Sequence, residues 1–415
     1  MKKVMVIGLS PEYNYPGDYD KWSSENTRYA SNHGASLISR TLIKMFDADY
    51  IDDFSRVEEY RRKYELCILA FATHITDWRD VKPYADFVEE LDIPTAAFSL
   101  GIQDYVGNAG SVRSVHPSML RILKHVSNTT GLIGVRGFYT ASLLYKEGFN
   151  NVVPVGCPTL FGPLSQNFGV ENRSNYSKPL NVFHRTLSDV TEKLISGIPL
   201  LGQDFLDEAV FTDRLSGDKK LVHAETQRYR GHAHGQTALD NIKLNGEFVW
   251  DFDSWFQRIG QADFVFGPRL HGCIAAIIQG IPAIMLARDI RVNEIARFFK
   301  IPVLNYGEIS GLSVDDLFER TNYQDFNKVY PRRYNNFIAF LAECNILQYL
   351  VKKEEPRPLE FSFGDLQEDR VCTYQKIEDL NKRLALLERN AGIRAIARVP
   401  RIVKRIPFVS KLWSR

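Results

Sequence analysis

Residues 262–272 combine side-chain types that can bind an anion and transfer a proton. An apolar run ends at Gly267, and Arg269 and His271 follow it, two residues apart. A guanidinium forms bidentate hydrogen bonds with a phosphate or a carboxylate, and an imidazole exchanges a proton near neutral pH. The segment therefore predicts a site for a phosphorylated acid, at a strand end that solvent reaches. The alternative is that Arg269 forms a structural salt bridge and His271 is a histidine of the core.

The elements around this segment are those of an open α/β sheet. Residues 264–267 and 283–287 are short apolar runs typical of buried strands, and helical spacing follows at residues 272–279 and 293–300. Ligands of such sheets bind at the carboxyl ends of the strands. The free N–H groups and the dipole at the start of a helix attract an anion to the same edge.

The amino-terminal part of the chain shows the same alternation of apolar runs and helical spacing. Strands are predicted at residues 3–9, 66–71, 95–100, 131–136 and 152–155, and helices at residues 34–46, 81–91, 117–127 and 140–147. This order predicts a parallel sheet covered by helices, and hence the α/β class. The polar, Gly-rich residues 213–246 are predicted to form a long loop or insertion.

The 415 residues are too many for one ordinary hydrophobic core, so we expect two α/β domains. The predicted amino-terminal domain covers residues 1–165, and an Asn- and Ser-rich linker follows it. The second domain covers residues 179–330. A helical extension at residues 331–388 and a basic amphipathic tail at residues 389–415 complete the chain.

Several short motifs together resemble the polysaccharide pyruvyl transferase family over roughly residues 30–300. They are Ile133-Gly134-Val135-Arg136, Leu143, Gly148, Gly156-Cys157-Pro158, Arg269-Leu270-His271-Gly272 and Gly280-Ile281-Pro282. The resemblance implies a fold like that of the GT-B glycosyltransferases, in which two Rossmann-like domains face a cleft. It implies phosphoenolpyruvate as the donor, bound by the second domain, and a pair of sugar hydroxyls as the acceptor, on the side of the first.

The same resemblance implies the site residues. Arg269 and His271 match the donor-site residues of the family and are the predicted catalytic residues. The predicted substrate-binding residues are Arg185, Arg136, Arg291, Asn32, Gly34 and Gly272. Three stretches depart from the family pattern: Ala35 and Cys157 replace acidic residues, and residues 70–74 lack the usual glycines. These departures lie in the first domain, so they concern the acceptor.

The expected reaction needs neither a cofactor nor a metal ion, because arginines can carry the electrostatic stabilisation. Asp251 and Asp253 resemble a metal-binding pair, but Asp253 or Ser254 is expected to cap a helix that begins near Trp255. The alternative functions are a GT-B nucleotide-sugar glycosyltransferase and a non-catalytic sugar-binding or scaffold protein.

Cysteine usage and charge indicate where the protein acts. The five cysteines are scattered and odd in number, which favours a reducing cytoplasm. Residues 389–415 contain eight Lys or Arg and no acidic residue, among apolar side chains that include Trp413. This pattern predicts peripheral contact with an anionic membrane at its inner face, near a lipid-linked acceptor. The alternative is a tail that is solvated or docked on its own protein. No nucleic-acid partner is expected, because the rest of the chain is net acidic.

Overall fold

The computed structural model describes residues 2–12, 32–103, 112, 114–184, 192–212, 235–287, 289–355 and 358. Met1–Glu360 forms one compact unit and Phe361–Arg415 a second. The second unit lies outside the described residues, and so do the predicted tail and much of the predicted helical extension. In the part of the chain that is described, no helix is long and apolar enough to cross a membrane.

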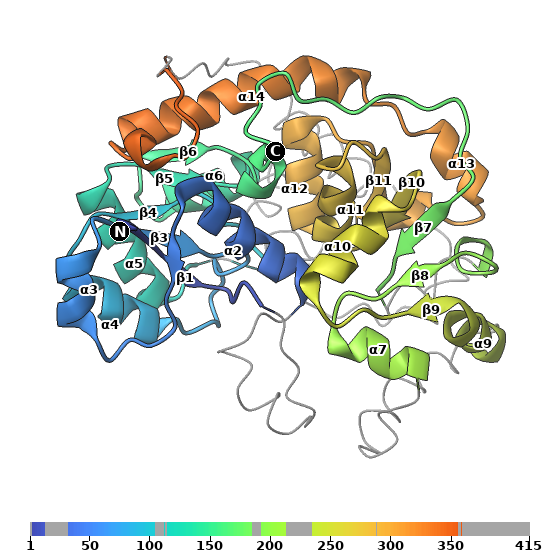
Figure 1. Ribbon diagram of the computed structural model, residues 1–415, viewed down its shortest axis with the longest axis horizontal. Coiled ribbons are helices and arrows are strands. Elements are labelled where there is room, and N and C mark those ends of the chain that lie inside the picture. Colours follow the sequence, from blue (N-terminus) through green and yellow to red (C-terminus); the bar gives the residue numbers. More distant parts are fainter. Residues whose placement is uncertain are drawn as a thin grey trace, which may run out of the picture. The chain divides into compact units, whose positions relative to one another are not determined.

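The first sheet has four parallel strands in the order β2-β1-β3-β4, of which β1, β3 and β4 are labelled in Figure 1. They are β1 (Val4–Gly8), β2 (Asp49–Tyr50), β3 (Leu66–Ala70) and β4 (Thr95–Ala97). β1 and β3 are nearly continuous apolar runs, as parallel strands covered on both faces require. The parallel pair β5 (Ile133–Val135) and β6 (Val152–Pro154) joins this half through a bridge between Leu100 and Val135.

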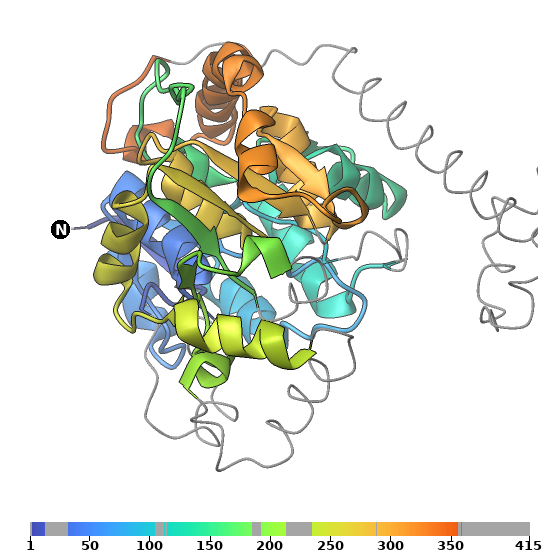
Figure 2. The ribbon, with the colours of Figure 1, turned by 90° about the vertical axis from the view of Figure 1, so that its right-hand side faces the viewer.

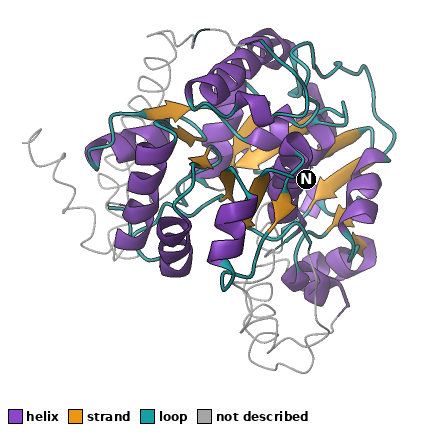
Figure 3. Cartoon of the chain, turned by 60° about the vertical axis from the view of Figure 1, so that its left-hand side comes forward, coloured by secondary structure: helices purple, strands orange, loops and turns teal. Residues whose placement is uncertain are grey.

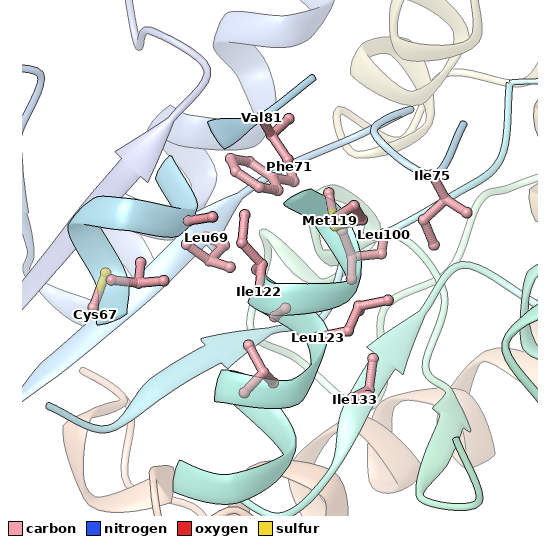
Figure 4. Close-up of a cluster of buried hydrophobic side chains, with 14 of the residues drawn as sticks. Cys67, Leu69, Phe71, Ile75, Val81, Leu100, Met119, Ile122, Leu123 and Ile133 are labelled. Atoms are coloured by element: carbon pink, nitrogen blue, oxygen red, sulfur yellow. The ribbon is translucent and has the colours of Figure 1, made fainter. Parts of the chain in front are cut away.

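Helices pack against these strands on both sides (Figure 3). The described helices of this half are α2 (His33–Phe46), α3 (Val57–Lys63), α4 (Lys82–Leu91), α5 (Pro117–Thr129) and α6 (Phe138–Lys146). On α5, Met119, Ile122 and Leu123 are three and four residues apart, so they share one face. They join Leu69 and Leu100 in the core cluster of this half (Figure 4).

The second sheet has six parallel strands in the order β12-β11-β10-β7-β8-β9. The strands are β7 (Pro179–Val182), β8 (Leu200–Leu201), β9 (Gly246–Glu247), β10 (Phe264–Gly267), β11 (Ala283–Ala287) and β12 (Val303–Asn305). The described α-helices of this half are α7 (Phe205–Thr212), α9 (Gly235–Asn245), α10 (Phe252–Gly260), α11 (Leu270–Ile277), α12 (Ile290–Phe299) and α13 (Val314–Glu319).

Helix α14 (Gln324–Glu343) connects the two halves; it is the long orange helix in Figures 1 and 2. Just before it, the Tyr323 hydroxyl donates to the Ala283 carbonyl of β11 at 2.7 Å. Further along, the Tyr330 hydroxyl donates to the Leu160 carbonyl at 2.9 Å, and the Phe337 ring packs against Phe98, just after β4. The helix therefore fixes the strands of one half against those of the other.

The predicted α/β fold with parallel sheets is confirmed. The loop predicted for residues 213–246 is wrong in its last part, because residues 235–245 form α9. Ile242 of this helix is fully buried in the core of the second half, beside Phe211 of α7. Burial of Ile242 thus supports a helix in a polar sequence, because tertiary packing supplies most of the stability of helices in proteins.

Candidate functional site

Strand β10 ends in a turn that requires glycine. Gly267 has a φ of 147°, and a Cβ there would lie 2.4 Å from the Val182 carbonyl oxygen. Pro268 follows, and Arg269 is the N-cap residue of α11. The structure therefore places Arg269 and His271 at the carboxyl edge of the sheet, as predicted, with His271 in the first turn of α11.

The Arg269 side chain turns into the second half of the molecule. Its Nε donates to the Phe183 carbonyl at 3.0 Å, and its Nη2 donates to the carboxylates of Asp204, at 2.6 Å, and of Asp207. Burial would lower the pKa of Arg269, but the two carboxylates raise it above its ordinary value. The residue is only 8% exposed, so the expectation of a solvent-reached Arg269 is wrong. Arg269 forms a structural salt bridge, which was the alternative interpretation of the sequence. Its contact with the donor substrate stays a prediction.

His271 faces the first half of the molecule. Its Nε2 lies 3.7 Å from Cys157 Sγ, which in turn lies 2.9 Å from the Thr159 hydroxyl. Burial, and after it the charges of Arg136 and Arg291, hold the pKa of His271 well below its ordinary value. The imidazole is therefore neutral at neutral pH.

The first turn of α2 packs against the first turn of α11. A Cβ on Gly34 would lie 2.5 Å from Gln203 Nε2 and 2.7 Å from His271 Cβ, so only glycine fits there. Asn32 is the N-cap of α2 and accepts hydrogen bonds from the Ala35 N–H at 3.0 Å and from Gln203 Nε2 at 2.9 Å. The amino ends of the two helices therefore meet beside His271.

The remaining predicted substrate-binding residues of this edge have different outcomes. A Cβ on Gly272 would lie 2.9 Å from the Val182 side chain, so this glycine permits close packing of α11 on β7. Arg185 lies outside the described residues. The structure shows packing and capping contacts for Asn32, Gly34 and Gly272, and their contact with a substrate stays a prediction.

Arg136, directly after β5, is completely buried. Its Nε donates to the Ser99 carbonyl at 2.9 Å, and a Cβ on Gly101 would lie 2.7 Å from its Cδ, which shows how closely its stem is packed. Nη1 and Nη2 are buried and form no hydrogen bond. Burial is the main cause that lowers the pKa of Arg136. A buried guanidinium with two unbonded nitrogens is costly, and an anion would relieve that cost.

The two carboxylates that act electrostatically on Arg136 accept hydrogen bonds from other groups. Asp289 accepts from Arg291 Nε at 3.0 Å and from Nη2 at 2.6 Å, and it also caps α12 through the Val292 N–H. Glu294 accepts from the Thr140 N–H and hydroxyl at 2.7 and 2.8 Å. Burial would raise the pKa of Asp289, but Arg291 lowers it, so this carboxylate stays ionised.

The contact of Glu294 with Thr140 also joins the two halves at the site. Glu294 belongs to α12, and Thr140 lies in the first turn of α6, which follows Arg136. A Cβ on Gly137, between Arg136 and Thr140, would lie 2.4 Å from Glu294 Cγ, so the two helices approach closely. This contact sets Arg136 of one half near Arg291 of the other.

Two residues of the segment after β3 complete the site, and the sequence analysis missed both. Burial, and then the charge of Arg291, lower the pKa of Arg79. Burial, with the charges of Arg79 and Arg136, lowers the pKa of His74 to about 3. The position of these residues just after a buried strand is the signal that could have found them. We call Arg79, Arg136 and Arg291 the arginine cluster.

Asp251 and Asp253 have structural roles. Asp251 caps α10 by accepting the Ser254 N–H at 2.7 Å, and Asp253 forms an ion pair with Arg40 at 3.0 Å. The prediction of Asp253 or Ser254 as the cap is wrong, because the helix begins earlier, at Phe252. Among the described residues, no group of three or more His, Cys, Asp or Glu side chains is placed to hold a metal ion.

Comparison with known proteins gives one sequence match and several distant structural ones. Residues 32–290 match the sequence model of the family described as polysaccharide pyruvyl transferase. A search of curated proteins finds no significant match.

The structural matches are at low similarity. S. aureus MnaA with UDP is 12% identical, with 87% of this chain and 100% of that chain covered and a TM-score of 0.42. A putative UDP-N-acetylglucosamine 2-epimerase from Listeria monocytogenes is 9% identical, with coverages of 86% and 98% and a TM-score of 0.40. Anabaena Alr3699/HepE with UDP and glucose is 11% identical, with coverages of 84% and 97% and a TM-score of 0.39. TM-scores below 0.5 carry no inference about this chain.

Proposed function

The chain belongs to the polysaccharide pyruvyl transferase family, a family of transferases. We propose that it performs the following reaction. It moves the pyruvyl group of phosphoenolpyruvate onto sugar hydroxyls of a polysaccharide or its lipid-linked precursor, forming a ketal and releasing phosphate. The observation that carries this proposal is the buried Arg136, whose Nη1 and Nη2 form no hydrogen bond.

The charge of the site suits this donor. Phosphoenolpyruvate carries a phosphate and a carboxylate, and guanidinium groups bind both with charge-assisted hydrogen bonds. Arg136 supplies two nitrogens that form no hydrogen bond, Arg291 adds positive charge near it, and Arg79 adds positive charge near Arg291. Asp289 already binds Arg291, whereas the buried Nη1 and Nη2 of Arg136 form no hydrogen bond. We therefore assign the main contact with phosphoenolpyruvate to Arg136. Arg269 has a structural role in the site through its salt bridge.

His271 is the proposed proton donor. In the free protein, burial and after it the charges of Arg136 and Arg291 lower the pKa of His271 and keep the ring neutral. An anion bound to these arginines cancels their charge at the imidazole, so the pKa of His271 rises when the donor binds. Binding of the donor therefore favours the protonated ring that the proposed proton transfer needs.

The reaction follows from these roles. Proton transfer from His271 to the methylene carbon of phosphoenolpyruvate leaves C2 electron-poor, and the arginines hold the phosphate and the carboxylate. A sugar hydroxyl adds to C2, and its proton restores His271. The C2–O bond to phosphate breaks, a second hydroxyl of the same sugar closes the cyclic ketal, and its proton leaves with phosphate or solvent.

The location of the enzyme is part of the same proposal. Cys67, Cys157, Cys273 and Cys344 are buried and unpaired, which supports a reducing cytoplasm. The basic tail at residues 389–415 is proposed to bind the inner face of an anionic membrane and to bring the enzyme to a lipid-linked acceptor. It lies outside the described residues, so its test is flotation with anionic vesicles, comparing the full chain with a chain that ends at Glu388.

The experiment that tests the proposed function uses the purified full chain with phosphoenolpyruvate and a panel of sugar acceptors. We expect phosphate release that depends on the acceptor, and a product heavier by pyruvate minus water. Arg136→Gln should lose this activity, whereas Arg121→Gln, a change to a partly exposed arginine of α5, should keep it. Release of a nucleotide from a nucleotide sugar, with no reaction of phosphoenolpyruvate, would overturn the proposal.

A further inference from the structure

Trp78 exposes an unusually large apolar surface for a residue so close to the site. Its side chain is 62% exposed, whereas Trp255 of α10 is fully buried. An indole combines a broad apolar face with one polar N–H, so tryptophan is enriched where proteins bind other molecules.

The segment that carries Trp78 is firmly attached to the first half. Phe71, Ile75 and Val81 all belong to the core cluster of that half (Figure 4). Ile75 also forms a parallel β-bridge with Ile102. The Thr76 carbonyl accepts the His116 N–H at 2.8 Å. The exposure of Trp78 is therefore a property of an anchored turn.

The same segment borders the arginine cluster. The Gly101 N–H donates to the Ala72 carbonyl at 2.8 Å, and Gly101 is the residue on which the Arg136 stem packs. On the other side of Trp78, the Arg79 backbone N–H donates to the Thr76 hydroxyl at 2.9 Å. The guanidinium carbon of Arg79 lies 5.1 Å from the centre of the Trp78 ring. One short turn thus links the exposed indole to the arginine cluster.

We propose that Asp77, Trp78 and Arg79 form a saccharide-binding subsite in which a ring of the acceptor stacks on Trp78. The C–H face of a pyranose is apolar and covers an indole well, and its hydroxyls need acceptors and donors at the rim of the ring. The exposed carboxylate of Asp77 accepts from hydroxyls, and the Arg79 guanidinium donates to them. The subsite belongs to the first half, where the acceptor was expected.

This inference rests on the proposed function, because it names the place where the acceptor of that reaction binds. Because the Arg79 guanidinium lies 5.1 Å from the centre of the Trp78 ring, a sugar that stacks on Trp78 is held beside the arginine cluster that binds the donor. The subsite itself is a claim about sugar binding, and it can be tested without transfer.

The test measures binding of the full-length protein to a printed array of mono-, di- and oligosaccharides, with phosphoenolpyruvate present. We compare wild type with Trp78→Ala, Trp78→Phe and Tyr145→Ala. Tyr145, on α6, is the matched control, because it is another exposed aromatic residue, at 46%. Trp78→Ala should weaken binding of the recognised sugars about two- to twelvefold, the range for one aromatic stacking contact. Trp78→Phe should retain part of the binding, and Tyr145→Ala all of it.

Two results would overturn the subsite: array binding by wild type that Trp78→Ala leaves unchanged, or no sugar bound by wild type at all. Thermal unfolding with and without phosphoenolpyruvate separates this outcome from failure of the proposed function. If the donor stabilises wild type but Trp78 is irrelevant to sugar binding, the subsite is wrong and the donor assignment stands. If sugar binding depends on Trp78 but phosphoenolpyruvate has no effect, the donor assignment is wrong and the subsite stands. Equal unfolding midpoints for the variants without ligand exclude a loss of fold.

Discussion

Replacement of Arg136 by methionine should make the unliganded protein more stable and at the same time remove its affinity for phosphoenolpyruvate. Methionine keeps an apolar stem against Gly101 but removes Nη1 and Nη2, which are buried without hydrogen bonds. Each such unsatisfied group costs about 1–3 kcal/mol, and the variant gives back a similar amount by leaving the Ser99 carbonyl without its donor. We therefore expect a net gain of roughly 1–3 kcal/mol in the free energy of unfolding.

The affinity should change in the opposite direction. Two charge-assisted hydrogen bonds to the donor contribute about 1.5–3 kcal/mol each, so their loss weakens binding by about a hundredfold or more. Denaturant unfolding with and without phosphoenolpyruvate measures both effects on one sample. Wild type should gain stability from the ligand, and Arg136→Met should begin higher and gain nothing.

A matched control separates this effect from the mere loss of an arginine. Arg121 of α5 is partly exposed and pairs at the surface with Asp86 and Glu89, so Arg121→Met should change stability by no more than about 0.5 kcal/mol and leave binding unchanged. The reasoning is refuted if Arg136→Met is less stable than wild type and still binds phosphoenolpyruvate normally, because Arg136 is then a structural residue.

Three further predictions concern the surroundings of the site. Arg269→Ala should lower the free energy of unfolding by about 3–5 kcal/mol, because it breaks the buried ion pairs of Arg269 with Asp204 and Asp207; an unchanged denaturation midpoint would contradict this. Gly34→Ala should destabilise by about 1–3 kcal/mol, since its Cβ would lie 2.5 Å from Gln203 Nε2, whereas Gly131→Ala, where a Cβ meets nothing, shows the cost of a left-handed backbone alone. Stability should fall as the pH drops from about 6.5 toward 4, because burial lowers the pKa of His33 to about 4 and of His74 to about 3, and holds that of His271 well below normal. In this range the histidines bind protons in the unfolded chain but not in the folded one, which costs about 1.4 kcal/mol of stability per pH unit for each histidine. His74→Gln should therefore show a shallower fall of the free energy of unfolding as the pH is lowered.

The sequence was most informative where one element carries the signal. The apolar runs of β1, β3, β10 and β11 and the helical spacing of α2 and α5 were enough to predict parallel sheets covered by helices. The turn at Gly267 likewise put Arg269 and His271 at the correct edge of the sheet. Both depend on local patterns, because a buried parallel strand must be apolar and a sharp turn needs glycine.

Short elements were not predictable in the same way. The strands β8 and β9 have two residues each, too few to show any periodicity. Helix α9 looked like part of a loop because its stability comes from burying Ile242 against the second core, which composition does not show. The start of α10 was placed late because Asp251, Asp253 and Ser254 are all good caps, and only the backbone decides among them.

Residue types and their spacing by themselves determined that a guanidinium and an imidazole stand together at a strand end, and the family resemblance added Arg136 and Arg291 as candidates. Only the tertiary structure decided their partners. Arg269 is neutralised by Asp204 and Asp207, which come from a segment more than sixty residues earlier in the chain. Arg136 is left with two unbonded nitrogens, and it meets Arg291 because Glu294 joins α12 to α6 across the two halves. The charge of a side chain follows from its type, but whether that charge is already balanced depends on contacts between residues far apart in sequence.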